Sequence, residues 1–225
     1  MVTVTDPETT RSMAPAGETL RNVDWATYCK LRDDPANDHL RMTYLDGDLT
    51  IQHGRPVLRP DSHRIMNMIV AVARAWRVRF HHSGNVTLFV GDGLETGTVG
   101  PHSFEGMYFG ENIKRVRGKK VTDLAFDPPP DLALEIDNTT NSEAHLPTYA
   151  RIGVPEVWRF DAVERTLWFG VLVGDHYEEA GRSLSLPRLT PSLVLEALAA
   201  RSQEPDDIDW FDWLYRWART LPEAA

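Results

Sequence analysis

The segment that decides the fold is Pro128-Pro-Pro-Asp-Leu-Ala-Leu-Glu-Ile-Asp137, where an apolar strand carries acidic residues at a period of two. Successive side chains of a strand point to opposite faces. One face therefore presents Asp131, Ala133, Glu135 and Asp137, and the other presents three aliphatic side chains. This pattern predicts a strand that packs on its aliphatic face.

Glu135 and Asp137 are the first candidates for chemistry in this strand. Two strand residues span about 6.6–7 Å, so both side chains can lean toward one divalent ion. Asp131 lies roughly 13 Å from Glu135 along the strand, which is too far to join them. Unpaired buried carboxylates are costly, and a metal ion would offset that cost. The alternative is an antiparallel strand whose acidic face lies in water.

The elements on either side of this strand predict an α/β fold with a mixed central sheet flanked by helices. Asp24 is the predicted N-cap of a short helix that begins at Trp25. Residues 42–51 then predict a hairpin around Asp46-Gly47. Apolar or alternating runs predict further strands at residues 86–90, 107–109, 157–160 and 167–172. Periodicity and end signals predict helices at residues 62–80 (capped by Ser62), 147–152, 192–201 and 208–220. The helix at 147–152 lies between two strands and so suggests a crossover.

The chain length predicts one compact domain with short terminal additions. We expect residues 1–20 to be a disordered leader, since they lack the basic start and apolar stretch of a secretory signal. Residues 21–190 form the predicted domain, and residues 191–225 form a helical extension. Three tryptophans, Trp210, Trp213 and Trp217, share one face of its last helix, which favours core packing or an interface.

Composition limits the compartment and the partners. A single cysteine, Cys29, excludes intramolecular disulfides, and no apolar segment spans a bilayer, so we predict a cytoplasmic protein. The net charge of −9 argues against broad nucleic-acid affinity, so any phosphate contact must be local. The densest basic cluster comprises Lys114, Arg115, Arg117, Lys119 and Lys120. This cluster faces phosphates if it borders the site, and otherwise it is a solvated hairpin turn around Gly118.

The stretch PPPDLALEIDNTTNSEAHLPTYARIGVPEVWRFD, residues 128–161, resembles the Uma-type family of restriction endonucleases, part of the PD-(D/E)xK nuclease superfamily. Such a family shows a PPDL strand, a glutamate, a Thr/Ser-rich loop and a Tyr-x-x-x-Gly-Val-Pro-Glu segment in this order. The resemblance extends from Tyr44-Leu-Asp-Gly-Asp48 to Ser183-Leu-Ser-Leu-Pro187. It implies a restriction-endonuclease-like core and Mg²⁺- or Mn²⁺-dependent cleavage of DNA.

The resemblance assigns roles to particular residues. The metal-binding glutamate matches Glu135, with Asp137 as an additional ligand. The family's lysine, four residues before Tyr149, is replaced by His145, which is either a general base or metal ligand or a solvated loop residue.

The family's upstream aspartate also departs from its pattern, because Phe104 stands at its position. Glu105 is the nearest carboxylate, but a shift of one residue turns a strand side chain to the other face unless a bulge intervenes. Asp131 offers a rival mapping within the same strand as Glu135, although Pro130-Asp131 is better explained as a turn before the strand.

Two functional hypotheses follow. The first is a Mg²⁺-dependent DNA endonuclease in which Glu135, Asp137 and Glu105 bind metal and His145 takes the lysine's place. The second is a degenerate nuclease fold that acts as a nucleic-acid-binding or protein-interaction module, because Phe104 and His145 break the motif. The expected partner is DNA, with no membrane association and a homodimer as one possible assembly.

Overall fold

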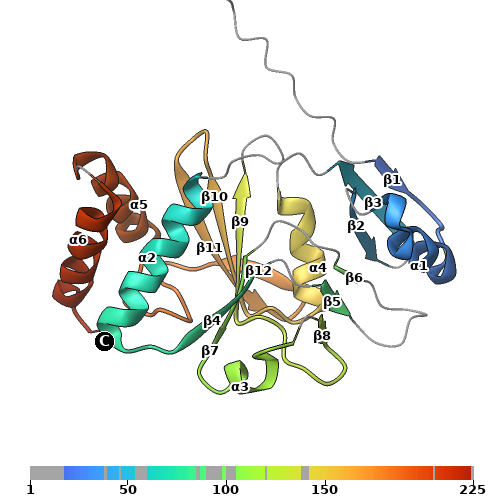
Figure 1. Ribbon diagram of the computed structural model, residues 1–225, viewed down its shortest axis with the longest axis horizontal. Helices are drawn as coiled ribbons and strands as arrows, with labels where there is room; N and C mark the ends of the chain where they lie inside the picture. Colours follow the sequence, from blue (N-terminus) through green and yellow to red (C-terminus); the bar gives the residue numbers. More distant parts are fainter. Residues whose placement is uncertain are drawn as a thin grey trace, which may run out of the picture.

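A computed structural model describes residues 18–37, 40–45, 47–53, 60–84, 87–89, 98–99, 105–119, 121–137, 142–204 and 206–223. In this part of the chain, two six-stranded mixed sheets lie side by side and helices cover them (Figure 1). The larger sheet has the order β12-β11-β10-β9-β7-β4, and the smaller has the order β1-β3-β2-β6-β5-β8. The predicted α/β class with a mixed sheet flanked by helices is confirmed.

The strands of the larger sheet are β4 (Phe80–Gly84), β7 (Glu105–Phe109), β9 (Leu132–Asp137), β10 (Glu156–Asp161), β11 (Thr166–Val173) and β12 (His176–Glu179). The strands of the smaller sheet are β1 (Glu18–Leu20), β2 (Leu40–Leu45), β3 (Asp48–His53), β5 (Thr87–Phe89), β6 (Thr98–Val99) and β8 (Val121–Asp123). The α-helices are α1 (Trp25–Asp33), α2 (Pro60–Trp76), α3 (Asn112–Val116), α4 (Leu146–Arg151), α5 (Pro191–Ala200) and α6 (Asp207–Thr220). Short 3-10 helices cover Pro35–Asn37, Ser142–His145 and Arg201–Gln203.

Strand β9 is an inner strand of the larger sheet. It pairs in parallel with β10 and antiparallel with β7. Helix α4 connects β9 to β10, so the predicted crossover is confirmed. Pro147 lies in the first turn of α4, and Gly153 follows it with a positive φ of 78°, which suits a glycine after a helix.

The main core lies on the aliphatic face of β9. Helices α2, α5 and α6 cover this face, and their buried side chains join those of β9, β10 and β11 in one cluster (Figure 1). At its centre, the fully buried rings of Trp158 and Phe169 stack with centroids 4.3 Å apart. The opposite face of the sheet packs under α4 through Ala133, Val157 and Tyr149. Both faces of β9 are therefore covered.

The smaller sheet builds a second cluster with α1. Asp24 caps α1 by accepting a hydrogen bond from the Thr27 backbone, and Tyr28 stacks on Tyr44 of β2 with centroids 4.9 Å apart. The hairpin of β2 and β3 has the predicted turn position, with Gly47 at a φ of 88°. Residues Glu18–Leu20 were expected to belong to the disordered leader. They instead form strand β1, which pairs with β3.

The second helix begins and ends earlier than its sequence pattern predicts. Helix α2 begins at Pro60, so Ser62 lies inside the first turn and is not the cap. The helix ends at Trp76, because Arg77 adopts a left-handed φ of 58°. Phe80, expected at the helix end, opens β4, since it pairs with Phe109 of β7.

The C-terminal helices are built into the main core. Thr190 caps α5 and Asp206 caps α6, each through a side-chain oxygen that accepts backbone N–H groups. Trp210 is fully buried and donates its indole N–H to the Ala197 carbonyl. The rings of Trp213 and Trp217 stack with centroids 5.6 Å apart and are partly buried. Core packing explains the tryptophan face, whereas the predicted homodimer stays a prediction.

None of the helices in the described ranges combines the length and the apolar character that crossing a membrane requires.

Truncating Trp210 tests how much α6 contributes to the stability of the main core. We expect Trp210→Ala to lower the free energy of unfolding by about 3–5 kcal/mol, because it empties a large, fully buried volume and removes a hydrogen bond. Ile208→Ala is the matched control, since Ile208 lies in the first turn of the same helix with 73% of its surface exposed. Urea denaturation of the control should change by less than about 0.5 kcal/mol. Equal, small effects would show that α6 is only loosely attached.

Candidate functional site

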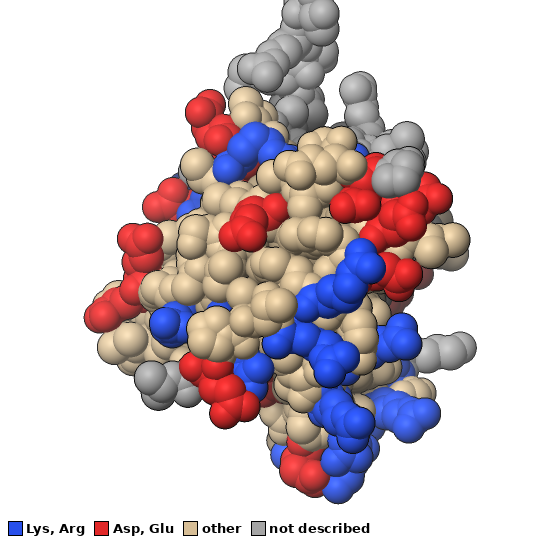
Figure 2. Space-filling view, turned by 90° about the vertical axis from the view of Figure 1, so that its left-hand side faces the viewer, with Lys and Arg blue, Asp and Glu red and all other residues tan. Residues whose placement is uncertain are grey.

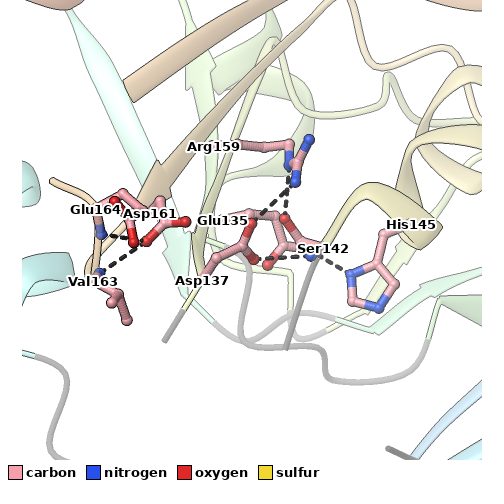
Figure 3. A network of polar contacts seen from close by, with 8 residues as sticks. All are labelled: Glu135, Asp137, Ser142, His145, Arg159, Asp161, Val163 and Glu164. Atoms are coloured by element: carbon pink, nitrogen blue, oxygen red, sulfur yellow. Dashed lines mark hydrogen bonds and ion pairs between the residues drawn. The ribbon is translucent and has the colours of Figure 1, made fainter. Parts of the chain in front are cut away.

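The candidate site lies on the α4 side of the larger sheet, toward the C-terminal ends of β9 and β10. The parallel register places Glu135 opposite Arg159, and Asp137 opposite Asp161. Residues in register on neighbouring strands share a face of the sheet. Two rows of polar side chains therefore follow the apolar row of Ala133 and Val157 beneath α4. Figure 3 shows these side chains gathered at one end of the sheet.

Glu135 is a buried carboxylate, with 3% of its surface exposed. Its Oε1 atom accepts a hydrogen bond from the Tyr149 hydroxyl and lies 2.9 Å from Nδ1 of His145. Both partners come from the chain that enters and forms α4. The alternative of an acidic strand face in water is wrong for Glu135, because β9 is an inner strand that α4 covers.

His145 lies at the end of the 3-10 helix that leads into α4, one helical turn before Tyr149. Its side chain is 20% exposed, so it is not the solvated loop residue of the alternative prediction. Burial is the largest single influence on this imidazole and lowers its pKa, but the hydrogen bond to Glu135 and the charges of Glu135 and Asp137 outweigh it. The net pKa lies above the usual 6.5, which favours a charged pair with Glu135.

Tyr149 is a residue of the site that served the sequence analysis only as a landmark. It is fully buried, and burial together with the charge of Glu135 raises the pKa of its hydroxyl well above 10. The hydroxyl therefore stays protonated and donates to Glu135. Its spacing of four from His145 was the available signal, because side chains four apart in a helical segment lie on one face.

Arg159 is a second residue that the sequence analysis missed. Its guanidinium Nη2 lies 3.1 Å from Oδ2 of Asp137, and its Nε donates to the Ser142 hydroxyl at 3.0 Å (Figure 3). The backbone N–H of Ser142 donates to Oδ1 of Asp137 at 2.9 Å, which closes a ring of three residues. The available signal was a charge inside the apolar strand segment Val157-Trp-Arg-Phe160, and only the strand register places it beside Glu135.

Glu135 and Asp137 each lie beside a cationic side chain. His145 is paired with Glu135 and Arg159 with Asp137, and the two carboxylates are only 4% and 13% exposed. Both have hydrogen-bond donors, as buried charges require. The unpaired carboxylates assumed from the strand pattern are therefore absent at these two positions.

The donor chemistry of the site nevertheless suits Mg²⁺. This ion takes hard oxygen ligands and is commonly held by one or two carboxylates, with water and substrate phosphates completing its shell. Glu135 and Asp137 supply carboxylates of this kind, so the residues fit the ion in chemical type. Across the described ranges, no group of three or more His, Cys, Asp or Glu side chains converges to hold a metal ion. Any further ligands must come from water, substrate or residues outside those ranges.

The structure describes only part of the segment that corresponds to the family's upstream aspartate. Phe104 lies outside the described residues. The backbone of Glu105 begins β7, where it pairs with Leu134 and not with Glu135. Its role as a metal ligand stays a prediction.

Two other acidic residues near the site have structural partners. Asp131 accepts hydrogen bonds from the Phe109 backbone and from Asn112, both at 2.7 Å, and so ties the turn before β9 to the end of β7. Asp161 accepts from the backbones of Val163 and Glu164 at 2.8 Å, as Figure 3 shows. The turn explanation of Asp131 agrees with these contacts, and the rival mapping does not.

The basic cluster does not border the carboxylates. Its described members lie on α3 and the turn after it, next to the start of β9, whereas Glu135 and Asp137 lie toward the end of that strand. Lys114 pairs with Glu111 and Lys119 with Asp127. Figure 2 shows blue side chains gathered in the lower part of the molecule, at the height of α3 in Figure 1. The expected hairpin turn is wrong, because the cluster begins on a short helix and Gly118 follows that helix.

Comparison with known proteins gives one extensive match. The model of the Uma2 family, described as "Putative restriction endonuclease", matches residues 25–203. This agrees with the resemblance seen in residues 128–161. Among solved structures, one similar chain is a putative nuclease belonging to DUF820 from Anabaena variabilis. It is 16% identical, with a TM-score of 0.42, and the match covers 77% of this chain and 90% of that chain. No curated protein matches this chain.

The pair of His145 and Glu135 predicts a dependence of stability on pH. Because the pKa of His145 is raised in the folded state, its stabilising effect is complete below the unfolded pKa and is lost as the pH rises through the folded pKa. We expect His145→Gln to lower the free energy of unfolding by about 1.5–3 kcal/mol at about pH 5.5, and by clearly less at about pH 9.

Urea denaturation at both pH values measures this difference. His176→Gln is the control, because that histidine is 63% exposed and pairs only with exposed carboxylates. An effect of His145→Gln that is the same at both pH values would exclude a charged pair with Glu135.

Proposed function

Since the chain belongs to the Uma2 family, we propose that it is a metal-dependent DNA endonuclease that hydrolyses phosphodiester bonds. The observation that carries the proposal is Glu135, a buried carboxylate held by His145 and Tyr149 at the end of a sheet where Asp137 and Arg159 also gather. A buried acid surrounded by titratable and cationic groups is more typical of a reactive site than of a structural one.

The two carboxylates have different supports in this proposal. Glu135 and Asp137 hold Mg²⁺ or Mn²⁺, and Glu105 is a further candidate ligand from the neighbouring strand. Tyr149 fixes one oxygen of Glu135, and the Ser142 backbone fixes one oxygen of Asp137. The ion, when bound, polarises the phosphoryl oxygen and lowers the pKa of the attacking water.

His145 is the candidate general base. Its side chain is 20% exposed, so water can approach it. In hydrolysis, a water oxygen attacks phosphorus and its proton passes to the imidazole of neutral His145. The bond from phosphorus to the leaving oxygen breaks, and the leaving oxygen keeps the bonding electrons and takes a proton from water. Because only the neutral imidazole accepts a proton, the raised pKa makes this step favour pH values above that pKa.

A degenerate module is the second candidate function, and one observation favours it. Glu135 and Asp137 are already balanced by His145 and Arg159, so the fold does not need a metal ion to offset two buried charges. A protein of this kind would bind nucleic acid or another protein without cleaving a phosphodiester bond. The two functions differ in their response to divalent ions.

Cleavage of supercoiled plasmid tests the proposed endonuclease. We expect the wild type to nick the plasmid with Mg²⁺ or Mn²⁺, and Glu135→Gln to lose at least about a hundredfold in activity. Mutation of a residue that only hydrogen-bonds to a metal ligand already lowers activity up to about a hundredfold, so loss of a ligand itself should cost at least as much. The control is Asp131→Asn, which changes an acid of the same segment whose oxygens serve Phe109 and Asn112. This control should keep nicking within about threefold, with a modest loss of stability.

Thermal unfolding with and without Mn²⁺ gives a second, independent readout. A ligand that binds only the folded state raises the midpoint, so the wild type should gain stability and Glu135→Gln should not. Absence of both nicking and a Mn²⁺-dependent shift in the wild type would reject the endonuclease and favour the module.

A further inference from the structure

We propose that Arg159 is the phosphate-binding residue of this site and supplies, from strand β10, the fixed positive charge that is absent at position 145. This inference rests on the proposed function for the identity of its ligand, a phosphodiester of DNA. It concerns a residue to which neither the sequence motif nor the family match assigns a role.

The strand register places Arg159 beside the carboxylate that is proposed to bind the metal ion. It is directly opposite Glu135 on the parallel strand and on the same face of the sheet. Its side chain is 18% exposed, against 4% for the side chain of Glu135, so a larger share of Arg159 is open to solvent. Its partner Asp137 is 13% exposed, so solvent reaches both members of this pair more readily than it reaches Glu135.

The guanidinium is held in a defined orientation. Its Nε donates to the Ser142 hydroxyl and its Nη2 to Asp137, and its carbon atom Cζ lies 5.9 Å from the ring centroid of Trp168 on β11. Trp168 is the residue opposite Arg159 in the antiparallel pair of β10 and β11. A planar guanidinium held in this way loses less side-chain entropy when it contacts an oxyanion.

Arginine differs from His145 in the permanence of its charge. The imidazole is charged only when protonated, whereas the guanidinium is always charged and its N–H groups match the oxygens of a phosphate in pairs. The two cations also have different partners: His145 contacts Glu135 and Arg159 contacts Asp137. The base and the fixed positive charge are thus divided between two residues.

A purely structural explanation is weaker for this position. The neighbours of Arg159 along β10, Val157, Trp158 and Phe160, are fully buried and apolar. Replacing a buried ion pair by well-packed apolar residues of similar volume is often neutral or stabilising, so the stability of the fold alone gives little reason for an arginine at this position.

Substitution of Arg159 by methionine separates the phosphate-binding role from a structural one, because a lost phosphate contact lowers the affinity for DNA and does not lower the affinity for the metal ion. Arg159→Met removes a cation next to Asp137, so its affinity for Mn²⁺, measured by electron paramagnetic resonance on the protein alone, should be equal or higher. Its affinity for a fluorescein-labelled 20-base-pair duplex, measured by anisotropy with Ca²⁺, should fall about 10- to 100-fold, as expected for a lost charged hydrogen bond. The duplex affinity of Arg159→Lys should fall less than about tenfold, since lysine keeps the charge but lacks the paired N–H groups of a guanidinium.

Arg188→Met is the matched control. Arg188 also pairs with a carboxylate, Glu223 at 2.8 Å, and its Cζ lies 5.2 Å from the ring centroid of Trp76. Trp76 is the last residue of α2, so this arginine lies on the side of α2 and not beneath α4. It should leave both affinities within about twofold of the wild type.

The outcomes distinguish this inference from the proposed function. A parallel loss of Mn²⁺ and duplex affinity in Arg159→Met, or a duplex affinity equal to that of the wild type, would overturn the role of Arg159. Selective loss of duplex affinity supports it, even when the wild type binds DNA without nicking and the endonuclease is thereby rejected. If Arg159→Met does not fold, Arg159→Gln takes its place, because it removes the charge but keeps a polar side chain beside Asp137 and Ser142. A duplex affinity equal to that of the wild type in Arg159→Gln would overturn the role of Arg159, and a selective loss of duplex affinity would support it.

Discussion

The parallel pairing of β9 with β10 is the interaction on which the rest of the structure depends. It covers the hydrogen-bonding edge of the central strand, places two aliphatic faces together under α2, α5 and α6, and places Glu135 beside Arg159 and Asp137 beside Asp161. A shift of β10 by one residue would turn its side chains to the other face, so that Arg159 would enter the core and Phe160 would leave it. The same hydrogen bonds therefore determine both the core and the polar end of the sheet.

The polar end of the sheet buries Glu135 and must also stabilise the charge of its carboxylate. Glu135 is buried enough to need partners for its charge, and His145 and Tyr149 provide them from one turn of helical chain. Glu156 shows what a purely structural carboxylate looks like in the same sheet: it is fully buried, and its oxygens accept from the Trp158 indole and the Ser185 backbone. Glu135 differs because its partners are a titratable imidazole and a tyrosine next to a partly exposed Asp137 and Arg159. This difference is why the chemistry is proposed at Glu135 and not at Glu156.

Local signals in the sequence were sufficient for most elements, and they failed where tertiary contacts decide. The strand at β9, the crossover through α4 and the caps at Asp24, Thr190 and Asp206 each depend on residues close together in the chain, although of these caps only Asp24 was predicted. The end of α2 was predicted four residues too late, because the apolar residues after Trp76 fit a helix and a strand equally well. Pairing of Phe80 with Phe109, far along the chain, selects the strand.

The sequence by itself determined the alternation that makes β9 apolar on one face and acidic on the other, and the order of strand, helix and strand that carries His145 and Tyr149 toward Glu135. These features follow from side-chain periodicity and from the geometry of a short crossover, which act over a few residues. Only the tertiary structure decided that the acidic face is covered by α4 and that Arg159 is the partner of Asp137. A charge in an apolar strand has no predictable neighbour until the strands are paired, because the register of two segments about twenty residues apart is set by the packing of the whole sheet.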